Sequence, residues 1–239
     1  MRSSALPTAE TKAHSVQRMF GAIAHRYDLL NHLLSLNRDR FWRAYAVDRL
    51  LEGSPEGRIL DACAGTLDLA VELGRRPSFR GLVMAADFSL PMLLAGLKKR
   101  TGLPIQVVCS DALQQPLADA CLDGAMVAFG VRNLASLDAG LAELARVLKP
   151  GGTLVILEFT TPSRRPFRAL YSLYLHGILP RVGKFLSGHS SAYSYLPASV
   201  QEFPPPSRLA DQIGAAGFHN VRWKTLTLGI VAVHTATRH

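Results

Sequence analysis

Acidic residues lie at the ends of two short apolar runs, and a turn of small residues follows the first of them. Asp61 lies near the end of Arg58–Ala62, and Asp87 ends Leu82–Asp87. Small residues allow a ligand to approach the backbone, and open α/β sheets bind ligands beyond the carboxyl ends of their strands. We therefore expect a cofactor at residues 61–68.

A dinucleotide matches this turn poorly. Dinucleotide sites have the pattern G-x-G-x-x-G, followed about 20 residues later by an acidic residue that binds the ribose. Asp87 supplies the acidic residue, but Gly65 is the turn's only glycine, so the sequence offers no cradle for a diphosphate. A nucleoside without phosphates is the ligand class that remains.

The elements that position this turn alternate in type. Buried strands, separated by helical stretches and by turns such as Pro150-Gly151-Gly152, are predicted at Arg58–Ala62, Leu82–Asp87, Ile105–Cys109, Ala125–Phe129 and Thr153–Phe159. This alternation predicts an α/β fold with a mostly parallel sheet and helices on both faces. The runs Gly217–Lys224 and Leu228–Thr237 are too close together for a crossover helix, so we expect them to form an antiparallel C-terminal hairpin.

The composition is that of one packed domain. Of 239 residues, 48% are hydrophobic and 19% are charged, which is enough apolar material for one core. We expect a flexible N-terminal arm over residues 1–15 and a single domain over 16–239, which begins with a helix through Phe20, Tyr27 and Leu34.

Several classes of protein are disfavoured. The three cysteines form neither an even set nor a C-x-x-C pair, and the histidines and acidic residues lack the spacing of metal ligands, so neither a disulfide framework nor a metal site is expected. No apolar run approaches the roughly 18 residues of a membrane span, and the first residues lack the apolar block of a signal peptide. A cytoplasmic location is therefore expected. Nothing in the sequence indicates an oligomeric state.

Positive charge is concentrated in one aromatic segment. The net charge is +9, and no acidic residue occurs between Glu158 and Glu202. We therefore predict a basic aromatic helical insertion or lid over residues 162–200; its basic and aromatic residues include Arg164, Arg165, Phe167, Arg168, Tyr171, Tyr174, Arg181 and Lys184. Such a helix either packs on its own domain or contacts an anionic membrane or an isoprenoid tail.

Several motifs occur together in the order of a known family. They are LDACAGTLDLA, the strand end at Asp87, SDALQQPLAD, AFGVRNL, RVLKPGG, LEFTTP and AGFHNVRWKTLTLGIVAVH. From Phe20 to His234 the chain resembles the ubiquinone/menaquinone C-methyltransferase family. The resemblance implies a class I methyltransferase with a seven-stranded, Rossmann-like sheet, which binds S-adenosylmethionine and methylates a ring carbon of a prenylated quinol.

The resemblance also assigns residues to the cofactor. It implies that Asp61, Gly65 and Thr66 line the methionine end and that Asp87 accepts hydrogen bonds from the ribose hydroxyls. Asp87 also suits a cap for the helix that opens at Ser89, and the two roles are compatible. The other implied cofactor residues are Phe88, Asp111 and Ala112 at the adenine and Ala128 at the end of the fourth strand.

Two residues depart from the family pattern, which has glycine at the positions of Ala64 and Leu67. Ala64 is a small change. Leu67 is a larger one, because a branched side chain disfavours a positive φ and would add bulk near the methionine group. Either the helix opens one residue early, or the affinity for the cofactor is lowered.

Attack by an aromatic carbon on a sulfonium methyl group needs an ionised hydroxyl beside that carbon, and a phenol has an unperturbed pKa of about 10. Arg132 and Asn133 are the first candidates, because an arginine stabilises negative charge and an asparagine orients a hydroxyl or a water. Arg132 could instead pair with a helix-end carboxylate. Tyr27 is a candidate lid residue, and His176, on the basic helix, is a candidate general base.

Other functions stay open to different degrees. A nucleic-acid methyltransferase is disfavoured, because the sequence lacks a D/N-P-P-Y motif and a Pro-Cys pair. A scaffold that has the fold but no turnover shares every surface feature of the enzyme. We favour demethylmenaquinol as the substrate on the resemblance alone, and precursors of ubiquinone or phylloquinone are the alternatives.

Overall fold

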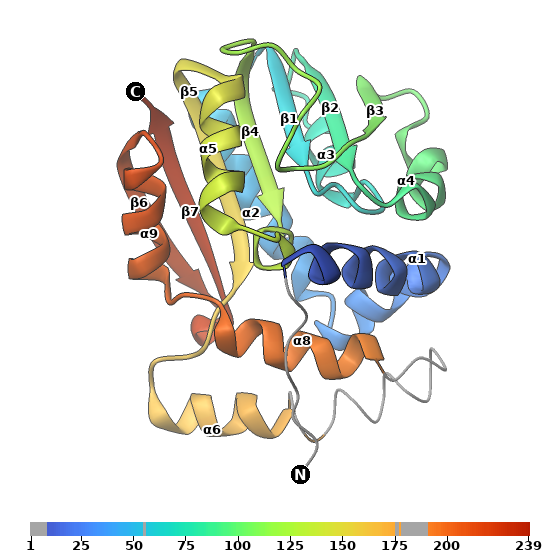
Figure 1. Cartoon of the computed structure of the whole chain (residues 1–239), viewed down its shortest axis with the longest axis vertical. Coiled ribbons are helices and arrows are strands. Elements are labelled where there is room, and N and C mark those ends of the chain that lie inside the picture. Colours follow the sequence, from blue (N-terminus) through green and yellow to red (C-terminus); the bar gives the residue numbers. More distant parts are fainter. Residues whose placement is uncertain (1–8, 55, 175–176, 178–190) are drawn as a thin grey trace.

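The computed structural model describes residues 9–54, 56–174, 177 and 191–239. Its centre is a seven-stranded sheet in the order β3-β2-β1-β4-β5-β7-β6 (Figure 1). The strands are β1 Arg58–Ala62, β2 Leu82–Asp87, β3 Ile105–Cys109, β4 Leu122–Ala128, β5 Leu148–Phe159, β6 Phe218–Leu226 and β7 Val231–Arg238. Strands β1 to β5 pair in parallel, and β7 is antiparallel to β5 and β6. The predicted fold class and C-terminal hairpin are confirmed.

Helices cover both faces of the sheet and the carboxyl ends of its strands. The α-helices are α1 Ala9–Leu34, α2 Arg38–Gly53, α3 Asp68–Gly74, α4 Leu90–Gly96, α5 Leu137–Val147, α6 Arg165–Leu173, α8 Ser191–Glu202 and α9 Pro206–Ala215. Short 3-10 turns are η1 Leu97–Arg100, η2 Val131–Asn133 and η4 Thr227–Gly229. Among the helices of the described residues, none has the length and apolar character that a bilayer span requires.

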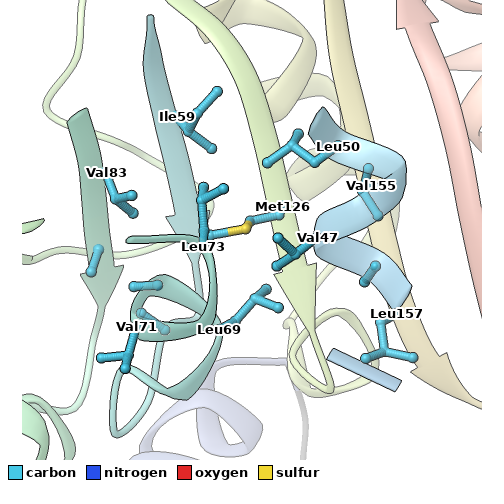
Figure 2. Packing of buried hydrophobic residues seen from close by; sticks show 14 of the residues in the cluster. Val47, Leu50, Ile59, Leu69, Val71, Leu73, Val83, Met126, Val155 and Leu157 are labelled. Carbon is cyan, nitrogen blue, oxygen red and sulfur yellow. The ribbon is translucent and has the colours of Figure 1, made fainter. Parts of the chain in front are cut away.

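Successive side chains along each strand point to opposite faces of the sheet, so the sheet has a hydrophobic core on each face. On one face, Ile59 and Met126 pack against Leu50 of α2 and Leu73 of α3 (Figure 2). On the other face, Leu60 and its neighbours pack against α5 and α9. Both faces of the parallel strands are therefore buried, which explains why these strands read as continuous apolar runs.

Several predicted boundaries are wrong. Strand β4, expected over Ala125–Phe129, spans Leu122–Ala128, because Leu122 already pairs with Leu148 of β5, and β6, expected over Gly217–Lys224, spans Phe218–Leu226. Residues 9–15, expected in a flexible arm, belong to α1, because the sequence from Ala9 to Ser15 contains neither glycine nor proline that would interrupt a helix. Strand β5 starts at Leu148 and not at Thr153: its register against β4 jumps from Leu122↔Leu148 to Gly124↔Thr153, so the predicted Pro-Gly-Gly turn is a bulge within the strand. Strand β7 begins at Val231, because η4 occupies the residues before it.

Leu67 has the left-handed backbone that the sequence made a concern. Its φ is 70° at the N-cap of α3, and its side chain is fully buried in the core shared by α2 and α3. The fit is tight, because a Cβ added at Gly96 would lie 2.8 Å from Leu67 Cγ and 2.5 Å from the Thr66 carbonyl oxygen. Packing therefore offsets a strain of about 1–2 kcal/mol for a left-handed non-glycine residue.

This balance predicts that glycine is a less destabilising replacement for Leu67 than alanine, the reverse of the order within a helix. Both Leu67→Ala and Leu67→Gly should lower the free energy of unfolding by about 2–5 kcal/mol through the lost side chain, but the glycine variant should be more stable than the alanine variant by about 1 kcal/mol. Urea unfolding measures both. Leu73, fully buried in the same core but within α3, is the matched control, since there alanine should be the more stable replacement. If the alanine variant were the more stable one at both positions, the left-handed strain at Leu67 would be refuted.

Candidate active site

Two cavities meet at the carboxyl edge of the sheet. The small cavity, of about 80 Å³, is lined by the strand-end residues Gly65, Asp87, Phe88, Asp111, Ala112 and Ala128, and by Asn133. The large cavity, of about 470 Å³, is mostly apolar and includes Arg132 in its wall. Phe20, Tyr27 and Phe129 line both cavities, so the two adjoin at these side chains.

Asp87 ties the first βα turn to the end of β2. Its Oδ2 accepts a hydrogen bond from the Gly65 N–H at 2.8 Å, and its Oδ1 accepts one from the Ser89 N–H at 2.8 Å. Burial raises the pKa of the Asp87 carboxyl, although both backbone donors favour the charged form. Each oxygen keeps a further lone pair, so the observed cap at Ser89 is compatible with binding of a ligand.

Two of the residues expected at the cofactor support the turn from behind instead of lining the small cavity. Asp61 is 1% exposed, and its Oδ2 accepts a hydrogen bond from the Ala70 N–H of α3 at 3.0 Å. Burial raises the pKa of Asp61 well above its ordinary value. The Thr66 hydroxyl donates to Asp28 Oδ1 at 2.5 Å. Leu67 lines neither cavity, so its side chain adds no bulk to either of them.

An ionic chain holds α1 across the end of the sheet. Lys99 Nζ lies 2.5 Å from Asp28 Oδ2 of α1 and 2.6 Å from Asp68 Oδ1 of α3. On its other side, Asp68 Oδ2 lies 3.4 Å from Arg43 Nη2 of α2. Asp28, whose role the sequence left open, thus fixes the helix that carries Tyr27 to the wall of both cavities.

The same chain continues through a buried carboxylate. Arg43 Nη1 contacts Asp39, whose oxygens also accept from Ser35 Oγ at 2.6 Å and lie 2.7 Å from His32 Nδ1. His32, Asp39 and Asp68 are close enough to share a cation. The Arg43 guanidinium already provides a positive charge to Asp39 and Asp68. The sequence analysis missed Arg43 and Asp39; the signal was their helical spacing with Trp42 in RDRFWR, which places charged and aromatic residues on one buried face.

Arg132 pairs with a carboxylate at a strand end, not at a helix end as the alternative interpretation had it. Its Nη1 lies 2.8 Å from Glu158 Oε1, near the end of β5, and its backbone N–H donates to Glu158 Oε2 at 3.3 Å. Both residues are buried, and the guanidinium carbon lies 5.3 Å from the centre of the Phe159 ring. Glu158, in the LEFT motif, was also missed as a functional residue, because its partner lies 26 positions away.

Tyr27 lines both cavities, and Asn133 lines the small one. The Asn133 amide donates to the Phe129 carbonyl at 3.2 Å, and its Oδ1 accepts from Tyr195 of α8 at 3.2 Å. Burial raises the pKa of the Tyr27 hydroxyl, while a hydrogen bond with Asn31 and the charge of Arg132 oppose that shift. His176 lies outside the described residues.

The mouth of the large cavity has an apolar rim. Leu36 after α1, Leu170 and Leu173 of α6, and Leu228 of η4 all line the cavity and are 81%, 66%, 64% and 64% exposed. Arg164, Arg165 and Arg168, at the start of α6, are exposed as well. The part of the predicted insertion that the structure describes consists of α6 and α8, which lie below the strand ends (Figure 1).

Comparison with known proteins identifies the family of this chain. Residues 8–238 match the ubiE/COQ5 methyltransferase family. The chain belongs to this family. Demethylmenaquinone methyltransferase of Mycolicibacterium vanbaalenii is 43% identical over 96% of the chain and 97% of that protein, and the enzyme of the same name from Thermus thermophilus is 46% identical over 92% and 100%. The crystal structure of a SAM-dependent methyltransferase from Aquifex aeolicus, 21% identical, covers 80% of the chain and 87% of that structure with a TM-score of 0.55, which reflects the shared fold.

The buried ion pair of this ubiE/COQ5 member yields a stability prediction. Glu158→Gln keeps the shape but leaves the Arg132 guanidinium without its buried counter-charge, so the free energy of unfolding should fall by about 3 kcal/mol. Urea denaturation measures the change. Asp119→Asn is the control, because Asp119 pairs with Arg146 at 2.5 Å but is 78% exposed, and its loss should cost below about 1 kcal/mol. Equal effects of the two substitutions would contradict the assignment.

Proposed function

We propose that this ubiE/COQ5 family member transfers the methyl group of S-adenosylmethionine to a ring carbon of demethylmenaquinol, a step of quinone biosynthesis. The observation that carries the proposal is the adjacency of a small cavity with polar strand-end groups to a large apolar cavity, with Tyr27 and Phe129 in both walls. A methyl donor and an apolar acceptor need such neighbouring sites, because the reacting atoms must approach to about 3–3.5 Å.

The lining of the small cavity suits the polar groups of the cofactor, and its volume of about 80 Å³ accounts for part of that molecule, so the methyl-bearing end would reach toward the adjoining large cavity. Asp87 offers carboxylate lone pairs for two ribose hydroxyls, Asp111 offers an acceptor for an amine, and Phe88 offers a face for the adenine. Gly65 has a φ of 54°, which favours glycine. A Cβ added there would meet only Met92, at 3.4 Å, so the space beside the Gly65 backbone is open to a ligand. When bound, S-adenosylmethionine supplies an electrophilic methyl group.

The large cavity suits a flat ring with the beginning of an apolar tail. Its volume of about 470 Å³ is typical of cavities for drug-sized ligands and too small for a long polyprenyl chain. The remainder of the tail would leave through the apolar rim of Leu36, Leu170, Leu173 and Leu228.

The residues at the junction can generate the nucleophile. Ionisation of the hydroxyl next to the attacked carbon is opposed by the apolar wall and favoured by the Arg132 guanidinium, which Glu158 holds at 2.8 Å. Asn133, held by Tyr195 and by the Phe129 carbonyl, can orient that hydroxyl or a water that accepts its proton. Tyr27, fixed through Asp28 next to it, helps to exclude bulk water.

The alternatives have less support. A precursor of ubiquinone or phylloquinone would fit the same apolar walls, but the relatives at 43% and 46% identity carry the name demethylmenaquinone methyltransferase. The scaffold without turnover depended on Leu67 as an obstacle to the cofactor. Leu67 lines neither cavity, so no structural observation favours that alternative.

Methyl-labelled S-adenosylmethionine, incubated with the purified protein and reduced demethylmenaquinone in detergent, should give a carbon-methylated quinone, detected by mass in the organic extract. Arg132→Ala should reduce turnover by at least about tenfold while binding of S-adenosylmethionine, measured by calorimetry, persists. Asp87→Ala should instead weaken that binding. The control Arg49→Gln removes a charge paired with Glu52 on α2, outside both cavities. Cofactor binding without any methylated product would refute the proposed substrate.

We further propose a peripheral position on the cytoplasmic face of an anionic membrane. The rim of the large cavity combines exposed leucines with Arg164, Arg165 and Arg168, and no acidic residue occurs between Glu158 and Glu202. Apolar side chains can enter the lipid boundary while nearby arginines meet its anionic head groups. This arrangement would place the cavity mouth where a tailed quinol resides.

Neutralising these arginines should release the protein from lipid. Each basic residue near an anionic surface contributes about 1 kcal/mol, so the triple variant R164Q/R165Q/R168Q should bind vesicles of phosphatidylglycerol and phosphatidylcholine at least about tenfold more weakly. Vesicle sedimentation measures the change. The control R58Q/R75Q/R80Q removes equal charge from exposed arginines near the amino ends of the strands and should bind normally. Equal loss in both variants would show only an effect of net charge.

A further inference from the structure

The large cavity contains a second buried guanidinium that the proposed chemistry leaves without a role. Arg43 is 7% exposed and lines the cavity, whose wall is otherwise mostly apolar. Burial of a cation in such a wall is costly unless the cation is paired. Asp39 and Asp68 pair with it, and the cost of the arrangement calls for a reason beyond packing.

The two arginines stand beside one pair of aromatic rings. The guanidinium carbon of Arg43 lies 5.9 Å from the centre of the Phe129 ring, and that of Arg132 lies 5.3 Å from the centre of the Phe159 ring. The two rings pack against each other, with centroids 4.6 Å apart and planes at 33°. Both cations therefore face the same aromatic wall, and both influence Tyr27 at the junction with the small cavity.

Arg43 is anchored so that its charge is fixed. Burial acts to lower the pKa of its guanidinium, but the carboxylates of Asp68 and Asp39 outweigh burial and raise that pKa. These carboxylates are shared with Lys99 and His32 respectively. A guanidinium has more N–H donors than its two contacts, at Nη1 and Nη2, engage, so it can still donate to a ligand.

We propose that Arg43 is a second anion-stabilising, substrate-binding residue, which donates to the quinol oxygen para to the one held at Arg132. This inference rests on the proposed function, because a 1,4-quinol is the ligand that carries two oxygens on opposite sides of a flat ring. With a cation near each oxygen, the apolar cavity takes up the quinol as its monoanion, the form whose ring carbon is nucleophilic. Tyr27, Asn31 and Ser35 are among the other polar residues that line this cavity.

A chromogenic naphthol tests this assignment without turnover. The dye 4-nitro-1-naphthol absorbs differently as naphthol and as naphtholate, so a pH titration in the presence of excess protein reports the pKa of the bound dye. Wild-type protein should lower that pKa, and Arg43→Gln should raise it by about one unit relative to wild type, a tenfold loss of preference for the anion. Arg43→Lys should retain most of the preference.

The control is Arg49→Gln, which removes the same charge from the same helix outside the cavities. Thermal unfolding checks that each variant is folded. The double variant R43Q/D39N removes a cation together with its carboxylate and should show the same shift without an uncompensated buried charge. A bound-dye pKa that is equal in R43Q, R43Q/D39N and R49Q, or no preference for the anion in the wild type, would overturn the proposal. Because no methyl transfer is involved, failure of the proposed reaction is detected separately.

Discussion

The placement of α1 across the strand ends is the constraint that both cavities share, and the ion pairs of Lys99 with Asp28 and Asp68 are part of it. They join α1 to the turn after β1, 2.5 Å and 2.6 Å on either side of one ammonium group. Helix α1 contributes Phe20 and Tyr27 to both cavity walls, so its position over the strand ends determines the shape of both cavities. Asp68 also pairs with Arg43. The same carboxylate therefore helps to hold α1 over the strand ends and to position the buried guanidinium in the large cavity.

The sequence predicted what local patterns determine. The bounds of β1, β2 and β3 match, because each is a short apolar run between turn residues, and Gly65 and Asp87 lie in the small cavity because strand ends place them there. The bulge in β5 escaped prediction, since it arises from the pairing with β4. Glu158 was missed for the same reason, because its partner Arg132 is distant in sequence. Arg43 has one partner four residues away, Asp39, which the helical spacing could have indicated, and one distant partner, Asp68, which only the folded chain brings to it.

The sequence left two outcomes open at Leu67, an early start of the helix or a lowered affinity for the cofactor. The helix does not start early, because α3 begins at Asp68, and the side chain lines neither cavity. The positive φ follows from the turn that the family builds with glycine, and the structure has it at 70°. The place of the side chain depends on tertiary packing: it is buried in the core shared by α2 and α3, where Gly96 of α4 lacks the Cβ that would lie 2.8 Å from Leu67 Cγ. The residue that departs from the family pattern therefore affects the packing of the scaffold and not the space for a ligand.

The two tryptophans of the chain differ in a way that gives the protein an internal optical reporter. Trp42 is 3% exposed in the wall of the large cavity, packs edge-on against Phe129 and Phe159, and donates its indole N–H to Thr227 at 2.7 Å. Trp223, on β6, is 47% exposed and lines neither cavity. The blue-shifted part of the intrinsic fluorescence therefore belongs to the cavity wall, and its quenching by an aromatic guest can be followed in real time against a solvent-exposed background, with no label attached.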